Sequence, residues 1–276
     1  MSSIRKVGVL GLGLVGASLA GALRRAGIEV VGWDPDSDAI RSLRRKRWLS
    51  KTALDPDRIE GDFQVLVLAG PLSVNESYLR LLAPRRFSFT VTDVGSVKTP
   101  IAKLGKKLLG SSFVPGHPMA GGTGSGFSFA TKNLFEDRPW SICGGGEKQQ
   151  RQVKKLIKAV GAHWVSMTPE GHDRTVAQVS HLPQVLASIL VSQTSKSKEP
   201  ALELTGPGFA DWARLAGSNP ELWTEILDAN KTSVVKEIKK LEKALARLRT
   251  EWEPQSTLKK GKEGYERWQN TSKPRP

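Results

Sequence analysis

The N-terminal part of the chain alternates short apolar runs with longer amphipathic stretches. The run 63–69 is almost continuously apolar and contains β-branched residues, which is typical of a strand covered on both faces. Similar runs predict strands at 4–10, 29–33, 87–93, 112–114, 140–143 and 163–166, and amphipathic stretches predict helices near 14–26 and 37–48. Because strands alternate with helices, we expect an α/β fold with a parallel sheet and right-handed crossovers.

The pattern changes after Thr168–Pro169, where no convincing strand follows and apolar residues recur at helical spacing. A residue able to cap a helix precedes a proline suited to the first turn of that helix at three places: Thr168–Pro169, Asn219–Pro220 and Thr99–Pro100. From 253 onward Pro, Lys, Gly, Ser and Gln dominate, which favours a flexible tail. We therefore predict three parts, namely an α/β domain over 1–167, an all-α domain over 168–252, and a tail over 253–276.

One stretch of the helical part carries a heptad-like seam. Its apolar residues step by four, three, four and three positions and are separated by charged residues: Val234, Ile238, Leu241, Leu245 and Leu248. Such a seam serves either packing within the helical domain or an interface between subunits, and the sequence leaves both open.

Composition limits the class of protein. The chain has 276 residues, enough for two domains, with 38% hydrophobic and 25% charged residues, as in globular proteins. A single cysteine, Cys143, excludes an internal disulfide and fits a reducing cytoplasm. No apolar stretch approaches the roughly 18 residues of a membrane span, and the N-terminus does not read as a signal peptide. We expect a cytoplasmic protein.

The chain has a net charge of +15, and its densest basic cluster consists of Arg41, Arg44, Arg45, Lys46, Arg47 and Lys51. A nucleic-acid site would need interleaved aromatic residues or a recognised motif, but only Trp48 is nearby. The cluster therefore favours a solvated helix face, which would also attract small anionic molecules. Nucleic-acid and membrane partners are not expected.

The motif Gly11-x-Gly13-x-x-Gly16 follows a predicted strand and opens a predicted helix, the context in which it indicates dinucleotide binding. The first glycine permits a tight turn, the second admits a pyrophosphate, and the third allows the helix to pack closely. Asp34 closes the second strand and suits ribose hydroxyls, favouring NAD, although the nearby arginines leave NADP open. We expect a doubly wound (Rossmann) domain whose cofactor contacts are Gly11, Gly13, Leu14, Val15, Gly16 and Asp34.

Two further motifs supply reactive groups. Asp93-Val-Gly-Ser-Val-Lys98 contains Ser96, and Gly116-His-Pro-Met-Ala-Gly121 contains His117. An imidazole near its reference pKa of about 6.5 is neutral at pH 7 and can accept a proton. With a dinucleotide, these groups are suited to oxidising an alcohol by hydride transfer. No Gly-x-Ser-x-Gly elbow supports a hydrolase, and no ligand spacing indicates a metal site.

These motifs, with Ser180-His-Leu-Pro-Gln184 and Gly208-Phe-x-Asp-x-x-Arg214, occur in the order found in prephenate/arogenate dehydrogenases. The resemblance covers roughly 4–250. It implies an enzyme of tyrosine biosynthesis that oxidises and decarboxylates prephenate or arogenate, acting as a homodimer through its helical domain. It further implies that His117 accepts the hydroxyl proton and Ser96 hydrogen-bonds that hydroxyl. Substrate contacts are implied for Arg214, His181 and, from the partner subunit, Trp223.

Alternatives remain beside these roles. His181 also suits a core position, Arg214 a surface position, and Lys98 either the substrate or a helix start. His163 and His172 are expected to be structural. The run Gly122-Thr-Gly-Ser-Gly126 and Ala210 depart from common family residues, which leaves substrate choice and feedback control open. We expect a monofunctional enzyme.

Two other functions compete with this one. A β-hydroxyacid dehydrogenase or imine reductase would usually need a catalytic lysine in the first helix of the second domain. Besides histidines, the only basic residue between 169 and 195 is Arg174. The other alternative is a basic nucleic-acid-binding scaffold that retains a dinucleotide fold.

Overall fold

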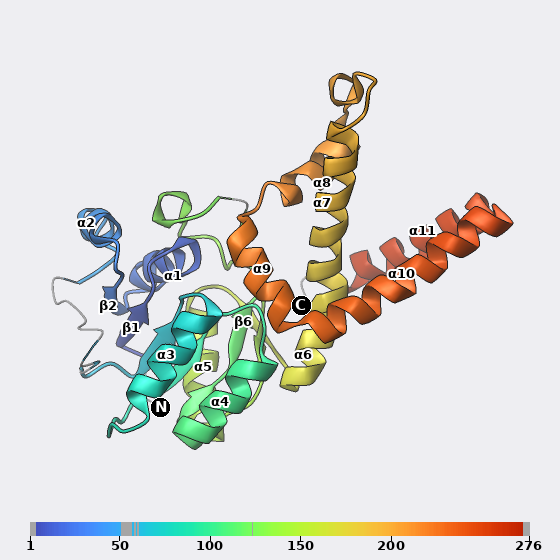
Figure 1. The fold of residues 1–276 in the computed structure, drawn as a ribbon. Coiled ribbons are helices and arrows are strands. Elements are labelled where there is room, and N and C mark those ends of the chain that lie inside the picture. The colour runs from blue at the N-terminus through green and yellow to red at the C-terminus, as the bar shows by residue number, and fades with distance from the viewer. Residues whose placement is uncertain (1–3, 51–56, 58, 60, 123, 273–276) are drawn as a thin grey trace.

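Five parallel strands form the central sheet of the computed structural model, which describes residues 4–50, 57, 59, 61–122 and 124–272 (Figure 1). Their spatial order is β2-β1-β3-β4-β5. The strands are β1 (Lys6–Leu10), β2 (Glu29–Trp33), β3 (Val65–Leu68), β4 (Thr90–Asp93) and β5 (Phe113–Val114). All four pairings between neighbours are parallel, as the alternation of strands and helices predicts.

Both faces of this sheet are buried. Val65 and Val67 of β3 belong to one core cluster, together with side chains of α1 (Leu14–Arg25) and α5 (Glu147–Ala159). The intervening Leu66 and Leu68 belong to a second cluster with side chains of α3 (Leu72–Leu82) and α4 (Thr99–Leu109). Successive strand residues point to opposite faces, so helices on both sides require a continuously apolar strand. The doubly wound α/β prediction is confirmed.

The strand order places a crevice beside β1. From β1 the chain moves to β2 on one side and then returns to β3 on the other. Ligands of open α/β sheets bind at such a switch point, outside the carboxyl ends of the strands. The glycine motif and Asp34 follow the carboxyl ends of β1 and β2, and therefore lie at this edge.

A second, mixed sheet follows the first. It contains β6 (Gly116–Pro118), β7 (Pro139–Ile142) and β8 (His163–Ser166), with β6 antiparallel to β7 and β7 parallel to β8. The expectation of one parallel sheet is therefore wrong for the last predicted strands. Pro115 separates β5 from β6, and its carbonyl accepts a hydrogen bond from the N–H of Cys143 at 2.8 Å. This turn starts the new sheet, and it places His117 on a strand.

The remaining described chain is helical. Its helices are α6 (Pro169–Val176), a π-helical turn (Ala177–His181), α7 (Leu182–Ser195), α8 (Pro207–Ala216), α9 (Pro220–Ala229), α10 (Lys231–Glu251) and α11 (Pro254–Ser272). Thr168 and Asn219 cap α6 and α9 as predicted, accepting hydrogen bonds from Gly171 at 3.0 Å and Leu222 at 2.8 Å. Thr99 differs, because it is the first residue of α4 and not its cap.

The tail expected from 253 is instead the helix α11 (Figure 1). Pro254 stands at its start, where a missing N–H costs nothing, and Arg267 pairs with Glu263 one turn earlier. In α10 the predicted seam is buried at Val234 but exposed at Leu245. The seam therefore packs within the chain at one end only.

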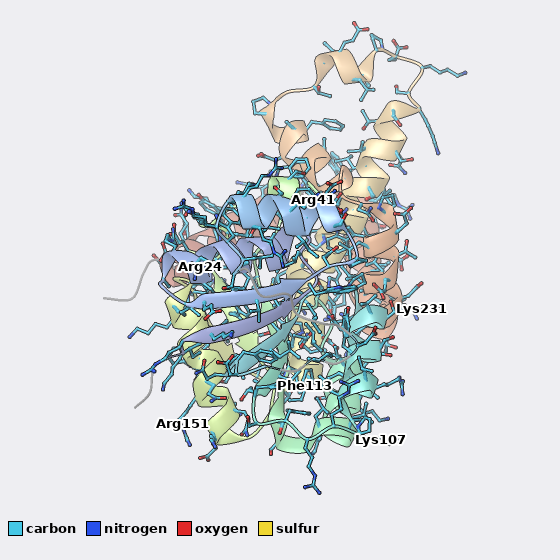
Figure 2. The ribbon with its side chains drawn as sticks, turned by 90° about the vertical axis from the view of Figure 1, so that its left-hand side faces the viewer. Arg24, Arg41, Lys107, Phe113, Arg151 and Lys231 are labelled. Carbon is cyan, nitrogen blue, oxygen red and sulfur yellow. The ribbon has the colours of Figure 1, made fainter. Side chains whose placement is uncertain are left out.

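Half of the basic cluster, namely Arg41, Arg44 and Arg45, lies on α2 (Ser37–Arg45), and Figure 2 shows Arg41 there. Arg41 pairs with Asp38, whereas Trp48 is buried beneath the ammonium groups of Lys46 and Lys132. A buried indole offers no stacking surface to a base, which agrees with a solvated face. Lys51 lies outside the described residues. No helix in the described ranges is long and apolar enough to cross a membrane.

Candidate active site

The glycine loop has the shape that a pyrophosphate requires. Gly11 has φ +93°, which only glycine adopts easily, and a Cβ on Gly16 would lie 1.9 Å from the Gly11 carbonyl oxygen. A Cβ on Gly13 would meet nothing within 4 Å, so this face of the loop is open. No side chain caps α1, whose first turn includes Leu14, Val15 and Gly16. These N–H groups and the helix dipole suit an anionic phosphate.

Asp34 is tied to this loop. Its carboxylate accepts hydrogen bonds from the N–H of Leu12 at 2.6 Å and of Asp36 at 2.8 Å. Each carboxylate oxygen has further acceptor capacity, which suits a neighbouring ribose hydroxyl. The residues predicted to hold the dinucleotide therefore lie together and fit that group.

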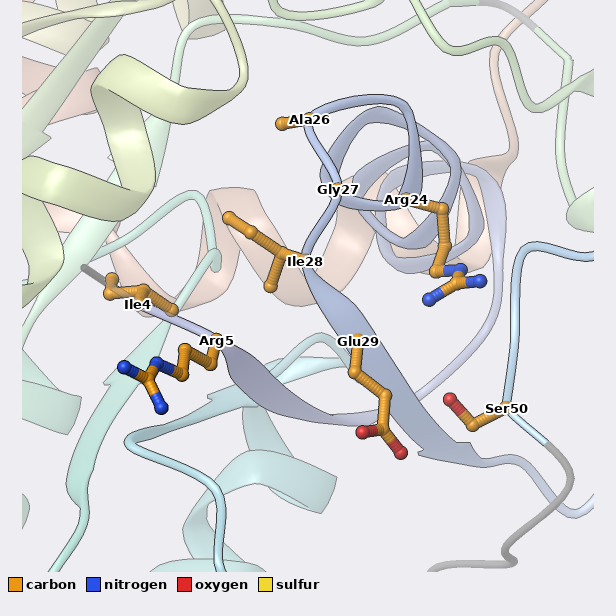
Figure 3. Close-up of a pocket in the computed structure, with 8 residues that line it drawn as sticks. All are labelled: Ile4, Arg5, Arg24, Ala26, Gly27, Ile28, Glu29 and Ser50. Atoms are coloured by element: carbon orange, nitrogen blue, oxygen red, sulfur yellow. The ribbon is translucent and has the colours of Figure 1, made fainter.

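A different cavity, of about 740 Å³, lies at the opposite end of the sheet (Figure 3). It is lined by residues at the start of β1 and β2 and the end of α1, among them Arg5, Arg24 and Glu29. Ligands of this fold bind at the carboxyl ends of the strands, so this cavity is not the cofactor crevice.

A buried ion pair fixes the strand that carries His117. The side chains of Asp93, which ends β4, and Lys98 are fully buried and contact each other. Lys98 also donates to the Gly116 carbonyl at 2.9 Å, and the N–H of Gly116 donates to Asp93 at 3.1 Å. Lys98 is thus neither a surface lysine nor free, and it joins β4 to β6.

His117 lies at the carboxyl-end edge of the large sheet. The segment beyond β6 passes the glycine loop, since a Cβ built on Gly122 would lie 3.7 Å from the Leu14 side chain. Ser96 is half-buried in the loop after β4, and no hydrogen bond joins it to His117 within the described residues. The cofactor loop, Ser96 and His117 therefore share one edge.

His117 is the first of three buried groups in a line. Its Nδ1 lies 2.9 Å from Nε2 of His172, whose Nδ1 lies 2.8 Å from Oδ1 of Asp173. Asp173 also accepts the N–H groups of Lys98 at 2.7 Å and Thr99 at 2.8 Å, so it caps α4 in place of Thr99. His172 and Asp173 belong to the first helix after the α/β domain and connect that helix to the strand of His117.

His181 is connected to Asp173 through Asn230. Asn230 donates to the Asp173 carbonyl at 2.7 Å and lies 3.2 Å from Nδ1 of His181. Trp223 packs edge-on against His181, with ring centroids 5.9 Å apart. The resemblance implies that Trp223 serves the partner's site, whereas here it contacts His181 of its own chain. The π-helical turn that ends at His181 precedes Pro183, which lacks the N–H of a regular helix.

Arg214 is exposed on α8, and within the described residues no hydrogen bond or ion pair joins it to His117. Its neighbour Leu215 accepts a hydrogen bond from Gln184 at 2.9 Å, which ties α8 to the start of α7. Arg214 therefore belongs to a helix that packs against α7, whose first residue, Leu182, directly follows His181.

The surroundings of His117 and His181 keep these two histidines neutral. Burial, with the charges of His172, Lys98 and His181, holds the pKa of His117 well below its usual value. Burial lowers the pKa of His181 to about 4, although Asp173 opposes this. Burial would raise the pKa of Asp173, but hydrogen bonds from His172 and the α4 N-terminus outweigh it and lower that pKa. A neutral imidazole and an ionised carboxylate therefore coexist at neutral pH.

Sequence reasoning missed His172, Asp173 and Asn230, which no local motif singled out. The adjacent polar pair His172–Asp173, just after a predicted helix start, is the one sequence feature that could have indicated a hydrogen-bonded pair.

A glycine loop suited to a dinucleotide and a neutral, buried imidazole at the same edge of the sheet agree with a two-domain dehydrogenase. Residues 19–166 match the family model of the prephenate dehydrogenase nucleotide-binding domain, and 168–260 match that of the prephenate dehydrogenase dimerisation domain. The chain therefore belongs to the prephenate dehydrogenase family, as the resemblance predicts.

Known relatives agree with this assignment. A prephenate dehydrogenase of Lactococcus lactis is 30% identical over 250 residues, covering 88% of this chain and 70% of the relative. The A. aeolicus prephenate dehydrogenase, solved with hydroxyphenyl propionate and NAD+, is 28% identical with a TM-score of 0.86, covering 98% of this chain and 99% of the other. A Synechocystis arogenate dehydrogenase is 29% identical with a TM-score of 0.80, covering 95% and 99%.

Proposed function

We propose that this dehydrogenase oxidises and decarboxylates prephenate or arogenate with NAD(P), and that His117 accepts the proton of the ring hydroxyl. The observation that carries the proposal is the buried His117 imidazole, whose Nδ1 is occupied by His172 and whose pKa lies well below its usual value. This ring stays uncharged at neutral pH and keeps Nε2 for a substrate proton. The relatives that act on prephenate and arogenate support this substrate class.

The cofactor residues would be Gly11, Gly13, Leu14, Val15, Gly16 and Asp34. The loop and the first turn of α1 would bind the pyrophosphate, and the carboxylate of Asp34 would bind the adenosine ribose. The bound nicotinamide would supply the hydride acceptor. Because a carboxylate repels a 2′-phosphate, Asp34 favours NAD over NADP.

The substrate carboxylates require fixed cations. Arg214 is suited to this, because its planar guanidinium matches a carboxylate and its helix packs against the start of α7, directly after His181. His181 and Trp223 would form the neighbouring wall of the pocket. Ser96 would hydrogen-bond the substrate hydroxyl from the loop after β4. Loss of CO2 makes the substrate ring aromatic, so the site mainly orients the alcohol and takes its proton.

We also propose a homodimer through the helical domain. The support is the match to a dimerisation domain together with large apolar side chains exposed on its helices. These include Ile189, Leu190, Trp212 and Leu245.

Nicotinamide reduction tests the proposal. Prephenate and arogenate, each with NAD and with NADP, are offered to the purified protein, and the reduced nicotinamide is followed by absorbance. We expect reduction with at least one substrate and a preference for NAD. No reduction in any of the four combinations contradicts the proposal.

A separate variant tests the role of Arg214. Arg214→Gln should chiefly raise the Michaelis constant, because it removes a carboxylate ligand. The matched control is Arg151→Gln on the exposed face of α5, where the arginine lies 3.7 Å from Glu147. An unchanged Michaelis constant in Arg214→Gln shows that this arginine does not bind the substrate.

A further inference from the structure

The proposed function uses His172 only as the neighbour that occupies Nδ1 of His117, and it gives Asp173 no role. His172 is 1% exposed and Asp173 is 4% exposed, and together they extend the hydrogen-bonded line that begins at Nδ1 of His117. A polar pair buried this deeply is costly unless its hydrogen bonds are made, and here they are. The line joins the β6 strand of the α/β domain to the first helix of the helical domain.

The direction of each hydrogen bond follows from Asp173. Its carboxylate is ionised and only accepts, so the hydrogen between it and His172 belongs to Nδ1 of His172. With its hydrogen on Nδ1, His172 offers Nε2 as an acceptor, and this nitrogen accepts from Nδ1–H of His117. A neutral His117 consequently has its lone pair on Nε2. The carboxylate thus determines, through one intervening ring, which nitrogen of His117 is basic.

Asp173 accepts further hydrogen bonds, both at its carboxylate and at its backbone carbonyl. The N–H groups of Lys98 and Thr99 donate to its two oxygens, and Asn230 holds the backbone carbonyl of Asp173. The second amide hydrogen of Asn230 points to Nδ1 of His181 at 3.2 Å, which leaves the ring hydrogen of His181 on Nε2. His117 is therefore prepared to accept a proton and His181 to donate a hydrogen bond.

We propose that His172 and Asp173 are positioning residues that keep Nε2 of His117 unprotonated and stabilise the charge it gains during turnover, an inference that rests on the proposed function. In that step the C–H bond breaks and its electron pair leaves with the hydride for the nicotinamide. The hydroxyl proton moves to Nε2 of His117, and the C–O bond becomes a carbonyl. The resulting imidazolium donates Nδ1–H to His172, whose Nδ1–H faces the Asp173 anion. This arrangement offsets the repulsion from the buried ammonium of Lys98.

The ring tautomers test the inference without any turnover. The chain has only four histidines, so 15N-histidine labelling gives few NMR signals. We expect hydrogen on Nδ1 in His117 and His172 and on Nε2 in His181, with the exposed His163 as an internal reference. His172→Phe removes the acceptor and should shift His117 toward hydrogen on Nε2. A wild-type His117 with hydrogen on Nε2 overturns the inference, as does an unchanged tautomer in His172→Phe.

Turnover supplies the second test. His172→Phe should lower kcat by about 10²-fold or more, the size expected when a base is lost or misdirected, with little change in KM or cofactor affinity. His172→Gln should recover part of this loss, because its amide oxygen can accept Nδ1–H of His117. A packing role predicts the reverse order, since phenylalanine resembles the imidazole ring more closely in shape.

Matched controls and outcomes separate this inference from the proposed function. His163→Phe and His163→Gln, on the exposed strand β8, should leave kcat unchanged. A His172→Phe kcat within about twofold of wild type, or above that of His172→Gln, overturns the inference. If the wild type reduces no nicotinamide with either substrate, the proposed function fails. The tautomers then still decide whether His172 and Asp173 orient His117.

Discussion

The buried Lys98–Asp93 pair offers a prediction whose magnitude follows from the structure. Both side chains are fully buried, and Lys98 also donates to the Gly116 carbonyl at 2.9 Å. Lys98→Met keeps the length of the side chain but removes the charge. It leaves the Asp93 carboxylate with only the N–H groups of Gly95 and Gly116 as donors, and the Gly116 carbonyl loses its buried donor.

Removing one partner of a buried ion pair typically costs about 3–5 kcal/mol, because the other charge stays desolvated. For a protein of this size that corresponds to a fall in Tm of roughly 10 °C. The double variant Lys98→Met/Asp93→Asn removes the stranded charge. It should therefore be more stable than Lys98→Met alone, with a coupling energy of about 1–3 kcal/mol between the two sites.

Urea unfolding, followed by tryptophan fluorescence, measures all four proteins of this cycle. Lys103→Met is the control, since Lys103 is exposed on the same helix and its loss should change stability by no more than about 0.5 kcal/mol. The reasoning is refuted if Lys98→Met loses less than about 1 kcal/mol. It is also refuted if the double variant is no more stable than Lys98→Met.

Two further predictions concern the cofactor loop and acid stability. Gly13→Ala should weaken NAD binding in a fluorescence titration without changing Tm, because the new Cβ meets no protein atom. Gly16→Ala should lower both NAD affinity and Tm, since its Cβ would lie 1.9 Å from the Gly11 carbonyl oxygen. An equal change of Tm in the two variants contradicts this prediction. In the folded protein the buried His181 has a pKa of about 4, so it stays neutral down to that pH. In the unfolded chain the same imidazole has a pKa of about 6.5 and takes up a proton below that pH. Stability is therefore full above pH 6.5 and decreases as the pH falls toward 4, by about 2 kcal/mol at pH 5 from this residue alone. His181→Gln should reduce that loss in urea unfolding at pH 7 and pH 5, and an identical loss would count against the account.

The sequence predicted the parts of the molecule that local patterns determine. The apolar run of β3 predicts a strand covered on both faces, and the glycine motif predicts the turn between β1 and α1, because each depends on neighbours in the chain. The caps at Thr168 and Asn219 are local in the same way. For this reason the doubly wound sheet and the cofactor edge could be predicted.

Contacts between distant segments could not be predicted. His172 meets His117 across 55 positions, and Asp173 caps α4 across 74 and 75. Neither contact leaves a periodic signal in the sequence, and the local pattern therefore predicts Thr99 as the cap of α4. The helix α11 was missed for another reason, since the composition of that segment favours a tail.

The central claim is that His117 accepts the substrate proton, and His117→Asn tests it most directly. Asparagine at this position lacks a basic ring nitrogen but leaves the glycine loop and Asp34 intact. The measurement is steady-state turnover with prephenate and arogenate, beside NAD affinity by fluorescence titration. The account predicts a fall in kcat of about 10²–10⁴-fold with nearly unchanged NAD affinity. An undiminished kcat in His117→Asn would contradict it.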